Sequence, residues 1–110
     1  MMDIRLNNNT YAVRYPINSI RMLERQLGRS VFSIFKSIET GDVSFDLMVS
    51  TIWAGIVHNS RALTVDNVSL WLEDVTNITE IFTGCAKEFS ESCASHLGGS
   101  GEKDSKSEKN

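Results

Sequence analysis

Residues 44–58 read SFDLMVSTIWAGIVH, and this stretch decides the fold. When it is placed on a helix at 100° per residue, its apolar side chains form one stripe at positions i, i+3, i+4, i+7 and i+11. The stripe consists of Phe45, Met48, Val49, Ile52 and Ile56. Trp53 and Val57 widen the apolar arc to about half of the circumference. Leu47 and Ala54 lie on the far side.

A helix this apolar is normally covered by other helices, so we predict that it is the centre of a bundle. Gly55 carries no side chain, and we expect a neighbouring helix to approach closely there. The chain has 110 residues, of which 41% are hydrophobic. That amount suffices for one small domain with its own core, which we place at residues 1–97.

The chain shows none of the sequence signals of export or membrane insertion. Asp3 and Arg5 interrupt the start of the chain, so we expect no signal peptide. No apolar run reaches the length of about 18 residues that a membrane span requires. Two cysteines without such a signal favour reduced thiols and a cytoplasmic protein. We therefore expect no membrane partner.

Charge is distributed unevenly along the chain. Residues 1–36 hold six basic and two acidic residues, a net charge of +4, whereas residues 37–97 hold two basic and nine acidic residues, a net charge of −7. The whole chain has a net charge of −3, which argues against nucleic acid as a partner. Two interpretations of the asymmetry stay open: a solvated surface, or head-to-tail association of subunits.

The first segments of the chain alternate between apolar and polar residues, which is typical of strands. Residues 3–6 and 10–15 are separated by asparagines, which tolerate positive φ, and the pattern predicts a β-hairpin. A lone hairpin is marginal, so this one must pack on helices or pair with another subunit. Its apolar side chains are our candidates for self-association: Ile4, Leu6, Tyr11, Val13 and Tyr15.

The remaining segments follow helical periodicity between recognisable caps. Asn18 or Ser19 is the expected start of a helix that ends at Gly28, and Ser30 starts a second one that ends at Gly41. After the central helix, Thr64 caps a helix that runs to Val75. Asn77 and Glu80 have capping-box spacing at the start of a last helix that runs to Leu97.

The fold class is therefore mainly α: a small bundle of about five helices with an N-terminal β-hairpin. Residues 98–110 read GGSGEKDSKSEKN and contain no apolar side chain, so we predict a disordered polar tail.

No combination of residues indicates catalysis, and we expect no enzyme, cofactor or metal site. His58 and His96 lie in different segments, without an acid at the spacing of a triad. Cys93 and His96 could supply two metal ligands, whereas zinc usually takes three or four. Cys85 falls within the apolar stripe of the last helix and is better explained as a small core residue.

Apolar residues left outside the helix stripes point to an interaction protein instead. Met22, Phe32, Leu70 and Trp71 lie off the stripe of their helix or at its edge. Each alone is ordinary, but together with the hairpin edge they favour a binding protein over an enzyme.

The order of features resembles the small tail assembly chaperones of long-tailed bacteriophages, including those of prophages and gene-transfer particles. The resemblance covers residues 3–97. It rests on the hairpin IRL…YAVRY, the segment INSIRMLERQLG, the helix VFSIFKSI, the apolar central helix and the segment LTVDNVSLWLEDV.

The resemblance implies a mostly helical protein of the host cytoplasm that coats the tape measure protein until the tail tube polymerises. It also implies absence from the finished virion, and often a longer frameshifted form that recruits the tail tube protein. On this interpretation the subunits form a homo-oligomer through the hairpin. The client would bind the off-stripe residues together with Phe82 and Phe89 of the last helix.

A second interpretation stays open. The chain could be a small helical adaptor or regulatory protein of a mobile element, such as an antitoxin-like partner or an acidic transcription modulator. Affinity for one compact partner, with none for a long helical protein, would favour that interpretation.

Overall fold

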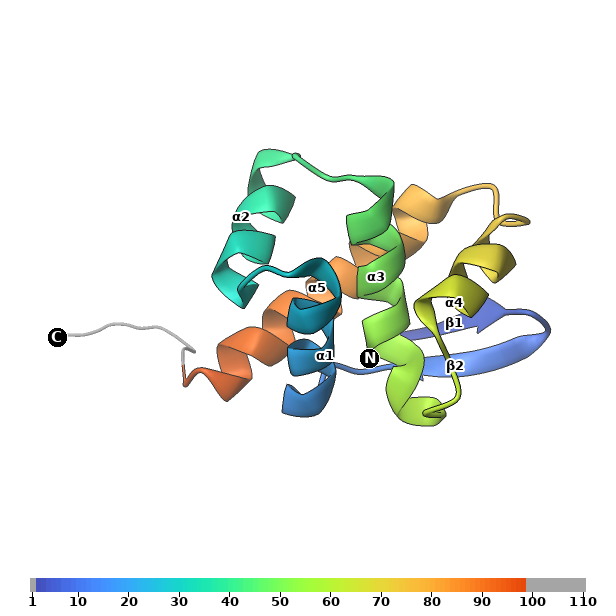
Figure 1. Cartoon of the computed structure of the whole chain (residues 1–110), viewed down its shortest axis with the longest axis horizontal. Coiled ribbons are helices and arrows are strands. Elements are labelled where there is room, and N and C mark those ends of the chain that lie inside the picture. The colour runs from blue at the N-terminus through green and yellow to red at the C-terminus, as the bar shows by residue number, and fades with distance from the viewer. Residues whose placement is uncertain (1, 99–110) are drawn as a thin grey trace, which may run out of the picture.

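The computed structural model describes residues 2–98, and they form five α-helices and one hairpin, as the sequence predicts (Figure 1). The strands are β1 (Met2–Leu6) and β2 (Asn9–Val13). The helices are α1 (Ile17–Leu27), α2 (Val31–Thr40), α3 (Phe45–Ile56), α4 (Val65–Leu72) and α5 (Ile78–His96), with a short 3₁₀ turn, η1 (Val57–Asn59), after α3. The predicted polar tail beyond Gly98 lies outside the described residues.

Helix α3 is the centre of the fold, as predicted. It packs against α1, α4, α5 and β2, and the long helix α5 crosses behind it (Figure 1). Because neighbours surround it, Leu47 and Ala54 on its far side are buried as well. The expectation for Phe45 is wrong: its side chain is 73% exposed. Phe45 is the first residue of the helix, so it lies at the end that the covering helices leave open.

Strands β1 and β2 pair antiparallel through a two-residue turn. Asn7 and Asn8 have φ angles of 51° and 65°, the left-handed values that a type I′ turn requires at both central positions. The register pairs Leu6 with Asn9 next to the turn and Met2 with Val13 at the far end. The hairpin and α4 lie at one end of the molecule and α2 at the other (Figure 1).

The hairpin docks on α3 where the helix lacks a side chain. The backbone N–H of Arg14 donates to the carbonyl of Gly55 at 2.8 Å. A Cβ atom at Gly55 would lie 2.7 Å from Oη of Tyr15 and 3.0 Å from Val13. The close neighbour at Gly55 is thus the chain at the end of β2, whereas the sequence suggested a helix.

Three of the predicted helix starts are confirmed by side-chain caps. Ser30, Ser44 and Thr64 each accept a hydrogen bond from the backbone N–H three residues on, at 3.0–3.2 Å. The prediction for α1 is wrong, since that helix begins at Ile17 and its first carbonyl acceptor is Pro16. Proline fixes φ near the helical value and is well suited to the start of a helix.

The start of α5 differs in detail from the capping box. Asn77 precedes the helix but makes no side-chain bond to its backbone. Its amide instead donates to the Glu80 carboxylate at 2.5 Å. The predicted pair of residues therefore meets, through side chains alone.

The ends of α1 and α2 follow the prediction. Gly28 and Gly41 close these helices with φ angles of 64° and 79°, as expected for left-handed caps.

Aromatic rings join the hairpin, α2 and α5 in the core. The Phe89 ring is fully buried, and its centroid lies 5.4 Å from that of Tyr15 and 5.2 Å from that of Phe35. Edge-on and tilted contacts at these distances add about 0.5–1.5 kcal/mol each to the gain from burial. The core therefore depends on segments that are distant in the sequence.

Candidate functional site

A mostly apolar groove lies where α3, α4 and α5 meet. It encloses about 350 Å³ and is lined by Phe45, Val49, Ser69, Leu72, Glu73, Val75 and Ile78. Its rim residue Phe45 is the most exposed large hydrophobic side chain among residues 2–98. A helix with an apolar stripe is the kind of ligand that such a groove accepts.

The chain segment that supplies most of the lining of this groove is acidic. Residues 65–80 contain four acidic residues and no lysine or arginine. Glu73 lies in the groove wall itself and is exposed. A segment that docks here would gain from basic residues beside its apolar stripe, because opposite charges at a rim favour encounter and set orientation.

A smaller apolar groove of about 230 Å³ lies at the other end of α5. It is formed between α1, the start of α2 and the last turn of α5, and Ile17 and Leu97 on its rim are more than half exposed. Ile78 in the first groove and Cys93 in the second are about 22 Å apart along the axis of α5, at 1.5 Å per residue. The chain thus offers apolar contacts at two well-separated places.

The structure divides the six residues predicted to bind a partner. Phe32 and Leu70 are 67% and 66% exposed, so both are accessible. Met22 and Trp71 are partly buried, and the Trp71 ring stacks on Tyr11 at a centroid distance of 6.3 Å. Neither Leu70 nor Phe32 lines the groove described above.

Two of those six predictions are wrong. Phe82 is only 6% exposed and Phe89 is fully buried, because the face of α5 that carries them packs against the rest of the bundle. They stabilise the protomer and offer no surface to a client. The sequence showed them in register on one stripe, and that stripe is a core face.

The predicted self-association residues are also placed inside the protomer. Ile4, Leu6, Val13 and Tyr15 are at most 6% exposed, so their side chains cannot reach a second subunit. This face of the hairpin packs on the helices of its own protomer. The sequence allowed either such packing or pairing with another subunit, and for these side chains the first holds. Tyr11 is partly buried against Trp71.

The sequence pattern does not identify Phe45 and Ile78 as groove residues. Periodicity places Phe45 on the buried stripe of the central helix and Ile78 on the core stripe of the last helix. Both are the first residues of their helices, and a side chain in the first turn extends past the end of the layer that covers the helix. Their position directly after the caps Ser44 and Asn77 was the signal that could have identified them.

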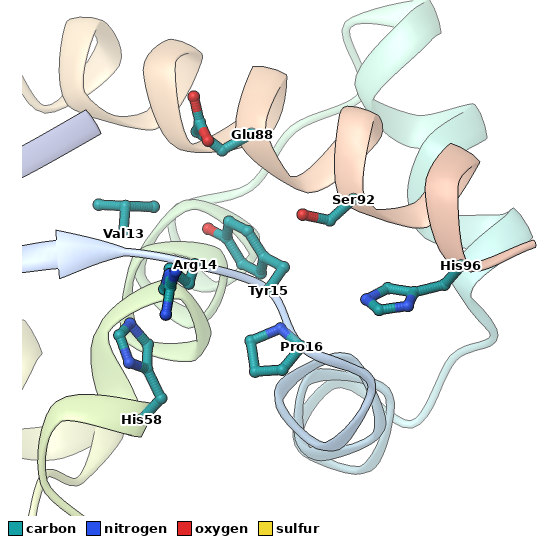
Figure 2. Close-up of a pocket in the computed structure, with 8 residues that line it drawn as sticks. All are labelled: Val13, Arg14, Tyr15, Pro16, His58, Glu88, Ser92 and His96. Atoms are coloured by element: carbon teal, nitrogen blue, oxygen red, sulfur yellow. The ribbon is translucent and has the colours of Figure 1, made fainter. Parts of the chain in front are cut away.

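A polar pocket of about 490 Å³ opens between the end of β2, η1 and the later turns of α5 (Figure 2). In Figure 2, Glu88, Ser92 and His96 lie along α5, and His58 lies across from them beside Arg14. Nε2 of His58 lies 2.8 Å from the carbonyl oxygen of Ala12, so this ring holds the end of β2.

Catalysis and metal binding each need particular contacts among the side chains of a pocket. In the described part of the chain, no hydrogen bond joins Ser92 to His58 or His96, which is the contact that activates a serine nucleophile. Nor do any three His, Cys, Asp or Glu side chains of residues 2–98 come together as a metal site would require.

The two thiols lie in the core, as predicted for Cys85. Burial raises the pKa of Cys85 to about 12, and burial also raises the pKa of Cys93 to about 11. Both cysteines are free, and their side chains are at most 2% exposed. At neutral pH they are thiols rather than thiolates, and the thiolate is the form that reacts and binds metals.

No helix within residues 2–98 combines the length and the hydropathy needed to cross a membrane. No protein family, curated protein or solved structure matches the chain.

Proposed function

We propose that this chain is a phage tail assembly chaperone that binds the tape measure protein and keeps it soluble while the tail assembles. It acts in the host cytoplasm, as an oligomer, and is left out of the mature virion. A longer frameshifted form would recruit the tail tube protein. The order of hairpin and helices that underlies the resemblance is the order in the structure.

The observation that carries this proposal is the groove rimmed by Phe45. Phe45 is 73% exposed and adjoins a mostly apolar groove, so the two together offer a larger apolar surface than an exposed side chain by itself. A tape measure protein is a long helical chain with apolar stripes. The groove would take apolar side chains from one face of such a helix, and many copies along one client would bind tightly through avidity although each contact is weak.

The acidic residues of segment 65–80 predict the charge of the client segment. The segment should carry lysine or arginine beside its apolar positions, because residues 65–80 have a net charge of −4. Such segments would otherwise expose their apolar stripe and aggregate. The chaperone covers the stripe until the tube subunits replace it.

The first test is co-expression with the long, helix-rich protein encoded just downstream, followed by size-exclusion chromatography. We expect the client to be soluble only in the presence of this chain, and the two to elute together. A client that aggregates regardless, while this chain elutes alone, would contradict the proposal. Binding to a compact partner instead would support the adaptor interpretation.

A matched pair of variants locates the binding surface. Phe45→Ser removes the rim of the groove, and Phe32→Ser removes an equally exposed phenylalanine from α2. Neither side chain contributes much to the core, so both variants should fold. We expect loss of client solubility with Phe45→Ser and none with Phe32→Ser. The reverse result would assign the client to α2 and reject the groove.

A further inference from the structure

The outer edge of β1 is an open template for another strand. The two-residue turn makes Leu6 and Asn9 a hydrogen-bonded pair, and pairs alternate along an antiparallel ladder. Ile4 therefore exchanges bonds with Tyr11, whereas the backbone groups of Asp3 and Arg5 point away from β2.

The contacts of β2 agree with this alternation. The carbonyl of Ala12, opposite Asp3, points outward and accepts bonds from Asn59 Nδ2 at 3.0 Å and from His58 at 2.8 Å. The edge of β2 is thus covered by η1. Within residues 2–98, no hydrogen bond reaches the backbone groups of Asp3 or Arg5, and both side chains are exposed.

The charges on this edge are complementary to themselves. If two copies of β1 run antiparallel with Ile4 facing the partner's Ile4, then Asp3 faces the partner's Arg5, and the reverse holds by symmetry. Shifting the register by two residues in either direction places Asp3 against Asp3 or Arg5 against Arg5. All three registers direct the free backbone groups toward each other, and only the first of them pairs opposite charges.

We propose that two copies of this chain associate through their β1 edges in that register, with Asp3 and Arg5 as the specifying residues. The result is a twofold dimer with one continuous antiparallel sheet across it. The side chains of Ile4 and Leu6 stay in their own core, so the contact uses main-chain bonds and the two exposed charges. The inference deepens the oligomeric part of the proposed function by naming its surface, and the contacts behind it do not depend on client binding.

The test uses the purified full chain without any client, so its outcome is independent of the proposed function. Sedimentation velocity from about 1 μM to about 1 mM should show a monomer–dimer equilibrium. Asp3→Lys and Arg5→Glu each replace two opposite-charge pairs by like-charge pairs. Each variant alone should dimerise about tenfold more weakly or worse, with unchanged circular dichroism.

A mixture of the two variants provides the decisive control. Lys at position 3 of one variant then faces Glu at position 5 of the other, and Arg5 faces Asp3. We expect a heterodimer at concentrations where neither variant dimerises alone. A chain that is monomeric throughout, a dimer insensitive to both changes, or a mixture that fails to associate would each overturn the proposal.

Discussion

The hydroxyl of Tyr15 donates a 2.6 Å hydrogen bond to the backbone carbonyl of Thr51, which is 36 residues further along the chain. The Tyr15 ring lies directly over Gly55, one helical turn beyond Thr51. Burial raises the pKa of this phenol well above its ordinary value, so the hydroxyl keeps its proton and remains a donor. The contact fixes the end of the hairpin to the central helix and sets where the N-terminal segment turns into α1.

Alanine substitutions at Gly55 and at Gly84 should have different effects on the free energy of unfolding. Gly55→Ala places a Cβ atom 2.7 Å from Tyr15 Oη and 2.8 Å from Cζ, in a fully buried site, so we expect a loss of about 1–3 kcal/mol in the free energy of unfolding. At Gly84 the new atom meets only the flexible end of Met2, at 2.6 Å from Cε. Gly84→Ala should be neutral or stabilising by up to about 1 kcal/mol, since alanine favours the helix. Urea unfolding of both variants measures the difference, and equal losses would refute it.

Buried hydroxyls on α2 and α3 offer a second comparison. Ser50 Oγ is buried and has no hydrogen-bond partner in the described structure, whereas Ser37 Oγ is bonded by the Arg29 guanidinium. Ser50→Ala removes an unpaired polar group from the core and should raise the free energy of unfolding by about 1 kcal/mol. Ser37→Ala breaks a bond to a charged group and should lower it by about 1–2 kcal/mol. Thermal or urea unfolding decides; a destabilised Ser50→Ala would show that its hydroxyl has a partner.

Stability should fall in mildly alkaline solution because of Cys85. Its folded pKa of about 12 lies above the ordinary value of 9.0, so the unfolded chain loses this proton first. The stabilising contribution is complete below about pH 9 and declines toward pH 12, by up to about 1.4 kcal/mol per pH unit. Tyr15 adds to the loss only above about pH 10.

Urea unfolding between about pH 8 and about pH 10 measures this decline. Because burial also raises the pKa of Cys93 to about 11, Cys85→Ala should reduce the decline by about half, and the double variant with Cys93→Ala should remove most of it. Thiol reagents at pH 8 should modify the two cysteines only as fast as the chain unfolds. Rapid modification of native protein would contradict the burial of both groups.

The corrected roles of the phenylalanines can be checked by stability alone. Phe89→Ala removes a fully buried ring that contacts Tyr15 and Phe35, and it should cost about 3–5 kcal/mol. Phe45→Ala removes a ring that is mostly exposed and should change stability by less than about 0.5 kcal/mol. If both variants were equally unstable, Phe45 would belong to the core and the groove would lose its rim.

Local patterns predicted the elements well because each signal is local. The caps Ser30, Ser44 and Thr64, and the asparagines of the turn, act within a few residues, and the structure uses them as the sequence suggested. Whether a stripe faces core or solvent depends on where other elements lie. For this reason the sequence did not show that Phe89 is buried and cannot contact a client. Its periodicity shows that α5 has an apolar face, and only the packing of the other elements shows what covers that face.

The groove could not be foreseen for a related reason. Phe45 follows the periodicity of α3, yet it sits one residue inside the start of the helix, where the bundle ends. The free edge of β1 depends on the position of η1, which covers β2 and leaves Asp3 and Arg5 uncovered. A strand pattern contains no information about which of its two edges a distant turn will occupy.

The ring contact between Tyr15 and Phe89 joins positions 74 residues apart, and the Cβ position of Gly84 lies against Met2. On the ribosome, the hairpin emerges before its partners on α5 have been made. The apolar face of the two strands therefore stays partly exposed until nearly the whole domain has been translated. Completion of the fold is coupled to completion of α5, so a chain truncated before Phe89 should be recognised by the cell as unfolded.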